Sequence, residues 1–299
     1  MDSVFALQIG SAVILNAAFA WLLGSWLARR WLFSAGATRM ESEGLLSLTD
    51  VAAAALGVLA TCAALWASAA AMGGVGLFEA TDLFWQMLTM TSVGRSGAMS
   101  LGAIILVLVI RTFHTTAAWR EWTVLAILGL FAFVRASMGH AGENGYGTVP
   151  FAAEVVHLSA MGAWTGLAAV SASIAIGAPT LQHNLIRMGK YLESMSAAAL
   201  AAVLAVVITG LFNAWHRVGT FDKLFDDNIY TTALLVKVGL VSVALVLGGY
   251  NKFYGLAHAR SSEKGVERVK LVLQVESVVL LAVLIAAAIL TSQQPPSAE

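Results

Sequence analysis

The chain of 299 residues is 59% hydrophobic and only 11% charged, with no formal net charge at pH 7, and its mean hydropathy is +0.81. This composition excludes an ordinary soluble domain and indicates a protein that lies in a lipid bilayer. The zero net charge identifies no charged partner, and we expect none made of nucleic acid.

Apolar runs predict eight transmembrane helices. Each run approaches the roughly 20 apolar residues that cross a bilayer, and they lie at about 5–27, 48–71, 92–111, 120–138, 151–175, 193–214, 231–252 and 270–291. Pro150 begins the fifth run, where its missing N–H costs little, and the other three prolines lie outside the runs. We therefore predict an all-α polytopic membrane protein, built as an N-terminal half (1–136) and a C-terminal half (137–299).

The distribution of Lys and Arg predicts the orientation. The loops after the first, third, fifth and seventh runs, with their flanks, carry Arg29, Arg30, Arg39, Arg111, Arg120, Arg187, Lys190, Lys252, Arg260, Lys264, Arg268 and Lys270. The other loops carry only Arg217 and Lys223. The basic loops are therefore expected in the cytoplasm and both termini in the periplasm. The first run has arginines after it and none before it, which favours a retained helix over a cleaved signal peptide.

The fifth run contains a carboxylate, an imidazole and a thioether among apolar residues. Glu154, His157, Met161 and Trp164 fall within about 80° of arc on one helix face, at about 100° per residue. Polar groups inside lipid are costly and usually mark a functional site. An acid, a histidine and a methionine together form a ligand set for a soft transition metal.

Three histidines are expected near the outer surface. His140 ends the fourth run, His157 lies about one turn inside the fifth, and His216 closes the sixth. Ordinary alternatives are a core histidine bonded across helices for His157, a wet helix end for His140, an interfacial residue for His216, and simple packing for Met161. That the three histidines meet in space is a hypothesis.

Charged residues inside the runs give a second clue. Each would cost about 2.5–3.5 kcal/mol at a helix centre unless paired or wet. Arg95, Arg135 and Lys237 lie in outer parts of runs, and Glu276 lies nearer the cytoplasmic end of the last. Arg135 and Glu154 are similarly placed and are candidates to pair, whereas Lys237 and Glu276 differ by roughly 13 Å in depth. Both an ion-pair network that keeps helices in register and a wet path remain open.

An ordered series of motifs, densest from about residue 137 onward, resembles the CopD family of bacterial copper-resistance membrane proteins. The matching segments are Gly139-His140-Ala141, His157-Leu158 with Trp164-Thr165-Gly166, Thr209-Gly210-Leu211, Leu235-Val236-Lys237, Gly249-Tyr250-Asn251-Lys252, Glu276 and Pro295-Pro296. In the first half, Leu88-Thr89-Met90-Thr91 with Gly94-Arg95 is similar to the family's third span. The family's proline after its Asn-Lys/Arg pair is missing here, on the cytoplasmic side.

The resemblance implies copper transport at the bacterial inner membrane, from periplasm to cytoplasm, alongside a small periplasmic copper-binding partner. The histidines and the methionine of the candidate site are consistent with copper, because Cu(I) favours thioether and imidazole over hard oxygen ligands. His140, His157 and Met161 are the expected ligands of an outer copper site. His216 is a further expected ligand, only because the predicted topology places it at the same outer surface. Glu154 would orient an imidazole or attract cations. No nucleotide-binding signature is found, and we predict a protein that is not an enzyme.

A membrane cytochrome is the alternative. Histidines on facing transmembrane helices also hold haem through axial imidazoles. His157 with either His140 or His216 would serve, and the small residues Gly162, Ala163 and Gly166 would admit a porphyrin. No second histidine lies deep in another run, however, and an electron path across the membrane through two haems would need one. The residues therefore favour copper over haem.

Overall fold

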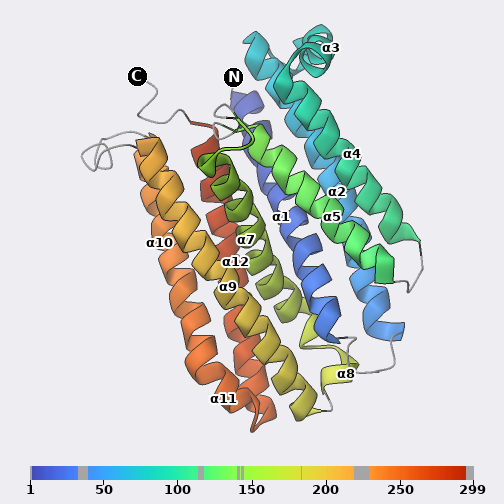
Figure 1. Cartoon of the computed structure of the whole chain (residues 1–299), viewed down its shortest axis with the longest axis vertical. Coiled ribbons are helices and arrows are strands. Elements are labelled where there is room, and N and C mark those ends of the chain that lie inside the picture. The colour runs from blue at the N-terminus through green and yellow to red at the C-terminus, as the bar shows by residue number, and fades with distance from the viewer. Residues whose placement is uncertain are drawn as a thin grey trace.

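The structure is a computed structural model that describes residues 2–32, 40–113, 118–139, 142, 145–182, 184–218 and 229–293. These residues form helices joined by turns and contain no strand. The long helices pack side by side as a bundle (Figure 1). The predicted all-α fold class is therefore confirmed for the described part of the chain.

Among the described residues, eight helices of 20 residues or more run along the bundle, and successive members alternate in direction (Figure 1). They are α1 (Asp2–Leu32), α2 (Met40–Gly73), α4 (Ser92–Thr112), α5 (Ala118–Ser137), α7 (Val149–Val170), α9 (Leu185–Val218), α10 (Ile229–Tyr250) and α12 (Glu263–Thr291). We call the end where α1 begins and α12 ends the upper end, and the opposite end the lower end.

Shorter elements lie at the two ends of the bundle. The 3-10 helix η1 (Leu77–Glu79) and α3 (Thr81–Met90) follow α2, and α8 (Pro179–Gln182) and α11 (Leu256–Ala259) lie at the lower end (Figure 1). Two π-helical turns, η2 (Ser171–Ala175) and η4 (Asn251–Gly255), continue α7 and α10. Both π-helical turns pack against α12.

Seven helices in the described residues are long and apolar enough to cross a membrane, so the chain is a polytopic helical membrane protein. The remaining predicted span is α5, which carries Arg120, Glu121 and Arg135 within its 20 residues. Each 18-residue stretch of α5 contains all three of these charges, so this helix lacks the long apolar segment that the other seven contain. Because α4 ends at the lower end and α7 begins at the upper end, α5 returns the chain along the bundle (Figure 1). An eight-span topology with both termini outside stays a prediction.

Helix α1 belongs to the predicted N-terminal half. It packs against α2 of the same half and against α7 of the predicted C-terminal half. One buried cluster joins it to α7, α9 and α12, and includes Ala28, Trp164 and Leu280. A second joins it to α2, α4 and α5, and includes Leu22 and Ile104. The division at residues 136 and 137 is not tested by this packing and stays a prediction.

The helices α1 and α7 touch through their backbones. A Cβ atom built on Gly24 would lie 2.1 Å from the carbonyl carbon of Gly166, and one on Gly166 would lie 1.8 Å from the Ala20 oxygen. Only glycine fits at this crossing, as at the small-residue contacts of many membrane helices. Trp164 is two residues before Gly166, and residues two apart on a helix point to nearly opposite sides. Because Gly166 faces α1, Trp164 points away from α1.

Candidate functional site

The upper part of the predicted polar face on α7 lies against α9. Asn213 Nδ2 donates a hydrogen bond to Glu154 Oε2 over 2.9 Å. One turn deeper, His157 Nδ1 lies 3.0 Å from Thr209 Oγ1. A Cβ atom on Gly210 would lie 3.3 Å from the Cε1 atom of His157, so the imidazole rests against that glycine. Glu154 and His157 therefore lie on one face of α7, as their helical spacing predicts, and both bond across to α9.

The hydrogen bonds of Thr209 assign the tautomer of His157. The Thr209 hydroxyl is 2.5 Å from the Ala205 carbonyl oxygen, a pure acceptor, so the hydroxyl proton is directed there. Thr209 Oγ1 then accepts a hydrogen bond from His157 Nδ1–H. In a neutral imidazole the other nitrogen, Nε2, carries the lone pair, which is the form that binds metal ions.

The lower part of the same face lies against α12. Met161 is 7% exposed and belongs to the cluster that joins α1, α7, α9 and α12. Trp164 is 2% exposed, and its indole Nε1–H donates to Glu276 Oε1 over 2.8 Å. Below it, the hydroxyls of Ser171 and Tyr191 lie 2.8 Å apart. Polar pairs thus follow this face along the length of α7 and its π-helical continuation.

Among the other predicted ligands, only His216 lies within the described residues, and it lies away from His157 along α9. His216 is exposed near the upper end of α9 and stacks on Phe212, with ring centroids 5.9 Å apart. It is two turns, about 10 Å, beyond Thr209 along the helix. His140 lies outside the described residues. Within the described part of the chain, no group of three or more His, Cys, Asp and Glu side chains could hold a metal ion.

The predicted pairing of Arg135 with Glu154 is wrong. Glu154 accepts from Asn213, whereas Arg135 Nη1 lies 3.9 Å from Met138 Sδ and meets no carboxylate in the described residues. Depth along two helices can be estimated from sequence, but helix rotation cannot. Glu276 also lies near the middle of α12, because that helix begins at Glu263, seven residues before the predicted span.

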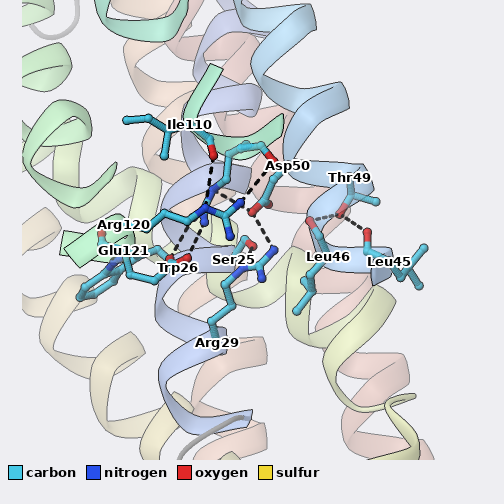
Figure 2. A network of polar contacts seen from close by, with 11 residues as sticks. Ser25, Trp26, Arg29, Leu45, Leu46, Thr49, Asp50, Ile110, Arg120 and Glu121 are labelled. Carbon is cyan, nitrogen blue, oxygen red and sulfur yellow. Dashed lines mark hydrogen bonds and ion pairs between the residues drawn. The ribbon is translucent and has the colours of Figure 1, made fainter. Parts of the chain in front are cut away.

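A second polar site, a network of buried charges, joins four helices near the lower end (Figure 2). Asp50 of α2 is fully buried, and its Oδ2 atom lies 3.0 Å from Arg29 Nη2 of α1 and 3.2 Å from Arg111 Nε of α4. Arg111 also donates two hydrogen bonds, of 2.6 and 3.1 Å, to the carboxylate of Glu121 on α5. Arg120 donates to the carbonyl oxygens of Ile110 and Arg111.

The positions of the three arginines in the sequence predict only cytoplasmic loops, and they do not single out Asp50 or Glu121. The missed signal was Asp50 itself, an acid at the start of an apolar run. A buried acid needs a cation, and arginines lie in the last turns of α1 and α4, at Arg29 and Arg111. The bidentate contact and the shared Asp50 oxygen indicate a structural tie between helices.

Comparison with known proteins places the family in the C-terminal part of the chain. Residues 189–290 match the family model of copper resistance protein D, CopD. We call this matching segment the CopD domain. It includes most of α9, all of α10 and α11, and most of α12. No curated protein and no solved structure matches the chain.

The resemblance inferred from the motifs is therefore confirmed for the CopD domain, and it implies a role in copper resistance or transport. Thr209, Asn213 and Glu276, which bond to the polar face of α7, all belong to this domain. Glu154, His157, Met161 and Trp164 precede it. The candidate site thus lies at the contact between the CopD domain and the helix before it.

Proposed function

We propose that this protein moves copper ions across the bacterial inner membrane, from periplasm to cytoplasm, through a site at His157 and Met161. The observation that carries the proposal is the hydrogen bond between His157 and Thr209, because it supports a tautomer whose Nε2 lone pair can bind a metal ion. The CopD domain supplies the threonine and supports copper as the metal.

The loops after the first, third, fifth and seventh apolar runs carry most of the basic residues, which supports a cytoplasmic position for the lower end and a periplasmic position for the upper end. His157 then lies about 12 Å below the start of α7, with Met161 one turn deeper. Copper would pass from this imidazole to the thioether one turn below it, and Cu(I) prefers both to oxygen. Glu154 attracts the cation from beside the site, while His140 and His216 remain the proposed outermost ligands. A small periplasmic copper-binding protein is the proposed donor.

A His157→Ala variant should lose copper-dependent uptake, because the imidazole is the first ligand below the mouth. Loss of the ligand's hydrogen-bond partner in Thr209→Val should cost about 10- to 100-fold in metal affinity, and loss of the ligand itself at least as much. Copper titration of the purified variants and the copper content of cells measure the two effects. His258→Ala is the matched control, since His258 is exposed at the lower end. Unchanged cellular copper in the His157→Ala variant would refute the site.

Visible absorption spectroscopy tests the alternative in which the same histidines bind haem. The visible absorption spectrum of the detergent-purified protein is recorded oxidised and then reduced. We expect no Soret band, because the described residues place no second histidine at the level of His157. A Soret band of stoichiometric intensity that is lost in His157→Ala would replace copper transport by a redox function.

A further inference from the structure

Glu276 is a buried acid midway along its helix. It lies about 20 Å from either end of α12 and is 3% exposed. An ionisable residue at this depth in a membrane helix is costly and usually has a function. Neither the proposed outer copper site nor the charge network at the lower end includes it.

The partner of Glu276 is a neutral group. The indole of Trp164 donates to Oε1 over 2.8 Å, and the described residues offer no cation in an ion pair with the carboxylate. A Cβ atom on Gly248 would lie 3.3 Å from Oε1, so the missing side chain at that glycine makes room for the acid. Lys237 lies on the same helix as Gly248 but eleven residues, about 16 Å, above it.

Other titratable groups on the elements packed against α12 also lie away from Glu276. Arg29 of α1 is bound to Asp50, and His157 of α7 lies about 10 Å above Trp164. Lys252 of η4 lies about one turn below Gly248 and makes no bond to the acid. A carboxyl group held by an indole alone can remain in place as a neutral acid or as a carboxylate, because Trp164 N–H donates to either form.

Unpaired polar groups lie on the two elements that border this acid. Asn251 is one turn below Gly248 and 3% exposed, and neither its Nδ2 nor its Oδ1 has a partner among the described residues. Thr165, next to Trp164, is 7% exposed and its hydroxyl is equally unpaired. Asn251 also begins the π-helical turn η4, and such turns are frequent at functional sites. Buried polar groups in membrane helices typically border an ion or proton path.

We propose that Glu276 is the proton carrier that couples copper movement to the proton gradient, which rests on the proposed copper transport. In each cycle an O–H bond forms at the carboxylate with a proton taken from one aqueous phase. The same bond breaks to release that proton into the other phase. Trp164 holds the group in both forms, and copper passes at His157 and Met161, higher on the same face of α7.

The test is a pair of transport measurements in proteoliposomes with Cu(I) kept reduced by ascorbate. One follows copper accumulation driven by an imposed pH difference, with a pH-sensitive dye inside. The other follows exchange of isotopic copper at equal concentrations and equal pH. In Glu276→Gln, accumulation and dye response should fall to the level of protein-free vesicles while exchange stays at the wild-type rate. Glu267→Gln, an exposed acid on the same helix, should behave as wild type.

The outcomes separate the two proposals. A wild type that moves no copper refutes copper transport itself. A wild type whose transport ignores the pH difference, or a Glu276→Gln variant that still couples, overturns proton coupling alone. Loss of exchange in a folded Glu276→Gln variant also overturns it, because the carboxylate would then act on copper.

A measurement on the wild type avoids any failure of the variant to fold. Dicyclohexylcarbodiimide is an apolar reagent that modifies protonated carboxyl groups. We expect mass spectrometry to locate the modification at Glu276, and we expect copper transport to be lost with it. Absence of modification at Glu276 across the pH range in which the protein transports copper would contradict its role as the proton carrier.

Discussion

A Gly166→Ala variant should be destabilised by about 3 kcal/mol or more, because the added methyl group overlaps backbone that cannot rotate aside. Its Cβ atom would lie 1.8 Å from the Ala20 carbonyl oxygen, so α1 and α7 would have to separate. Separation would also turn the face that holds His157 and Trp164, and copper uptake should fall with stability. The measurement is unfolding of the purified protein in mixed micelles of increasing sodium dodecyl sulfate.

The matched control for this variant is Gly129→Ala in α5. No atom lies within 4 Å of a Cβ built on Gly129, and the position is exposed. Alanine is a better helix former than glycine by about 1 kcal/mol, so this variant should be unchanged or slightly more stable. If Gly166→Ala unfolds at the same detergent fraction as Gly129→Ala, the close crossing of α1 and α7 is refuted.

The sequence predicted the long helices because an apolar run of about 20 residues matches the thickness of a bilayer when it is helical. It did not predict their full lengths. The helix α9 begins at Leu185 and continues to Val218, whereas its apolar run covers about 193–214. Polar residues at both ends extend the helix beyond the apolar segment, and hydropathy carries no information on where such extensions stop.

The polar face of α7 was predictable because helical spacing alone places Glu154 and His157 on one side. Their partners Asn213 and Thr209 were not, since pairing across helices depends on which helices are neighbours and how each is rotated. The same missing rotation made the expected pair of Arg135 and Glu154 wrong. The hydrogen bond between Trp164 and Glu276 joins residues 112 positions apart, and no local pattern indicates it.

The buried charges at the lower end show a different limit of sequence reasoning. Arg29 and Arg111 were interpreted as orientation signals, which requires only that they lie near the end of an apolar run. In the structure they are 5% and 0% exposed and bound to Asp50. One residue type thus satisfies both the orientation rule and a buried ion pair, and only the spatial position of the acid distinguishes them.

Replacement of Asp50 by asparagine should destabilise the protein by about 3–5 kcal/mol, because Arg29 and Arg111 would stay buried without their shared carboxylate. The expected effect is larger than that of a surface pair because water cannot reach the arginines. Unfolding in mixed micelles of increasing sodium dodecyl sulfate measures it. Glu193→Gln is the control, since Glu193 and its partner Arg260 are about half exposed and their pair is worth less than about 1 kcal/mol.

A second substitution distinguishes the charge from the shape of Asp50. Adding Arg29→Gln to Asp50→Asn removes the arginine that has lost its only carboxylate partner among the described residues, so the double variant should be more stable than the sum of the two single changes implies. Arg111 keeps its bidentate contact with Glu121 in that variant, which leaves α4 tied to α5. Additive losses, or an Asp50→Asn variant as stable as Glu193→Gln, would show that the network does not hold the four helices together.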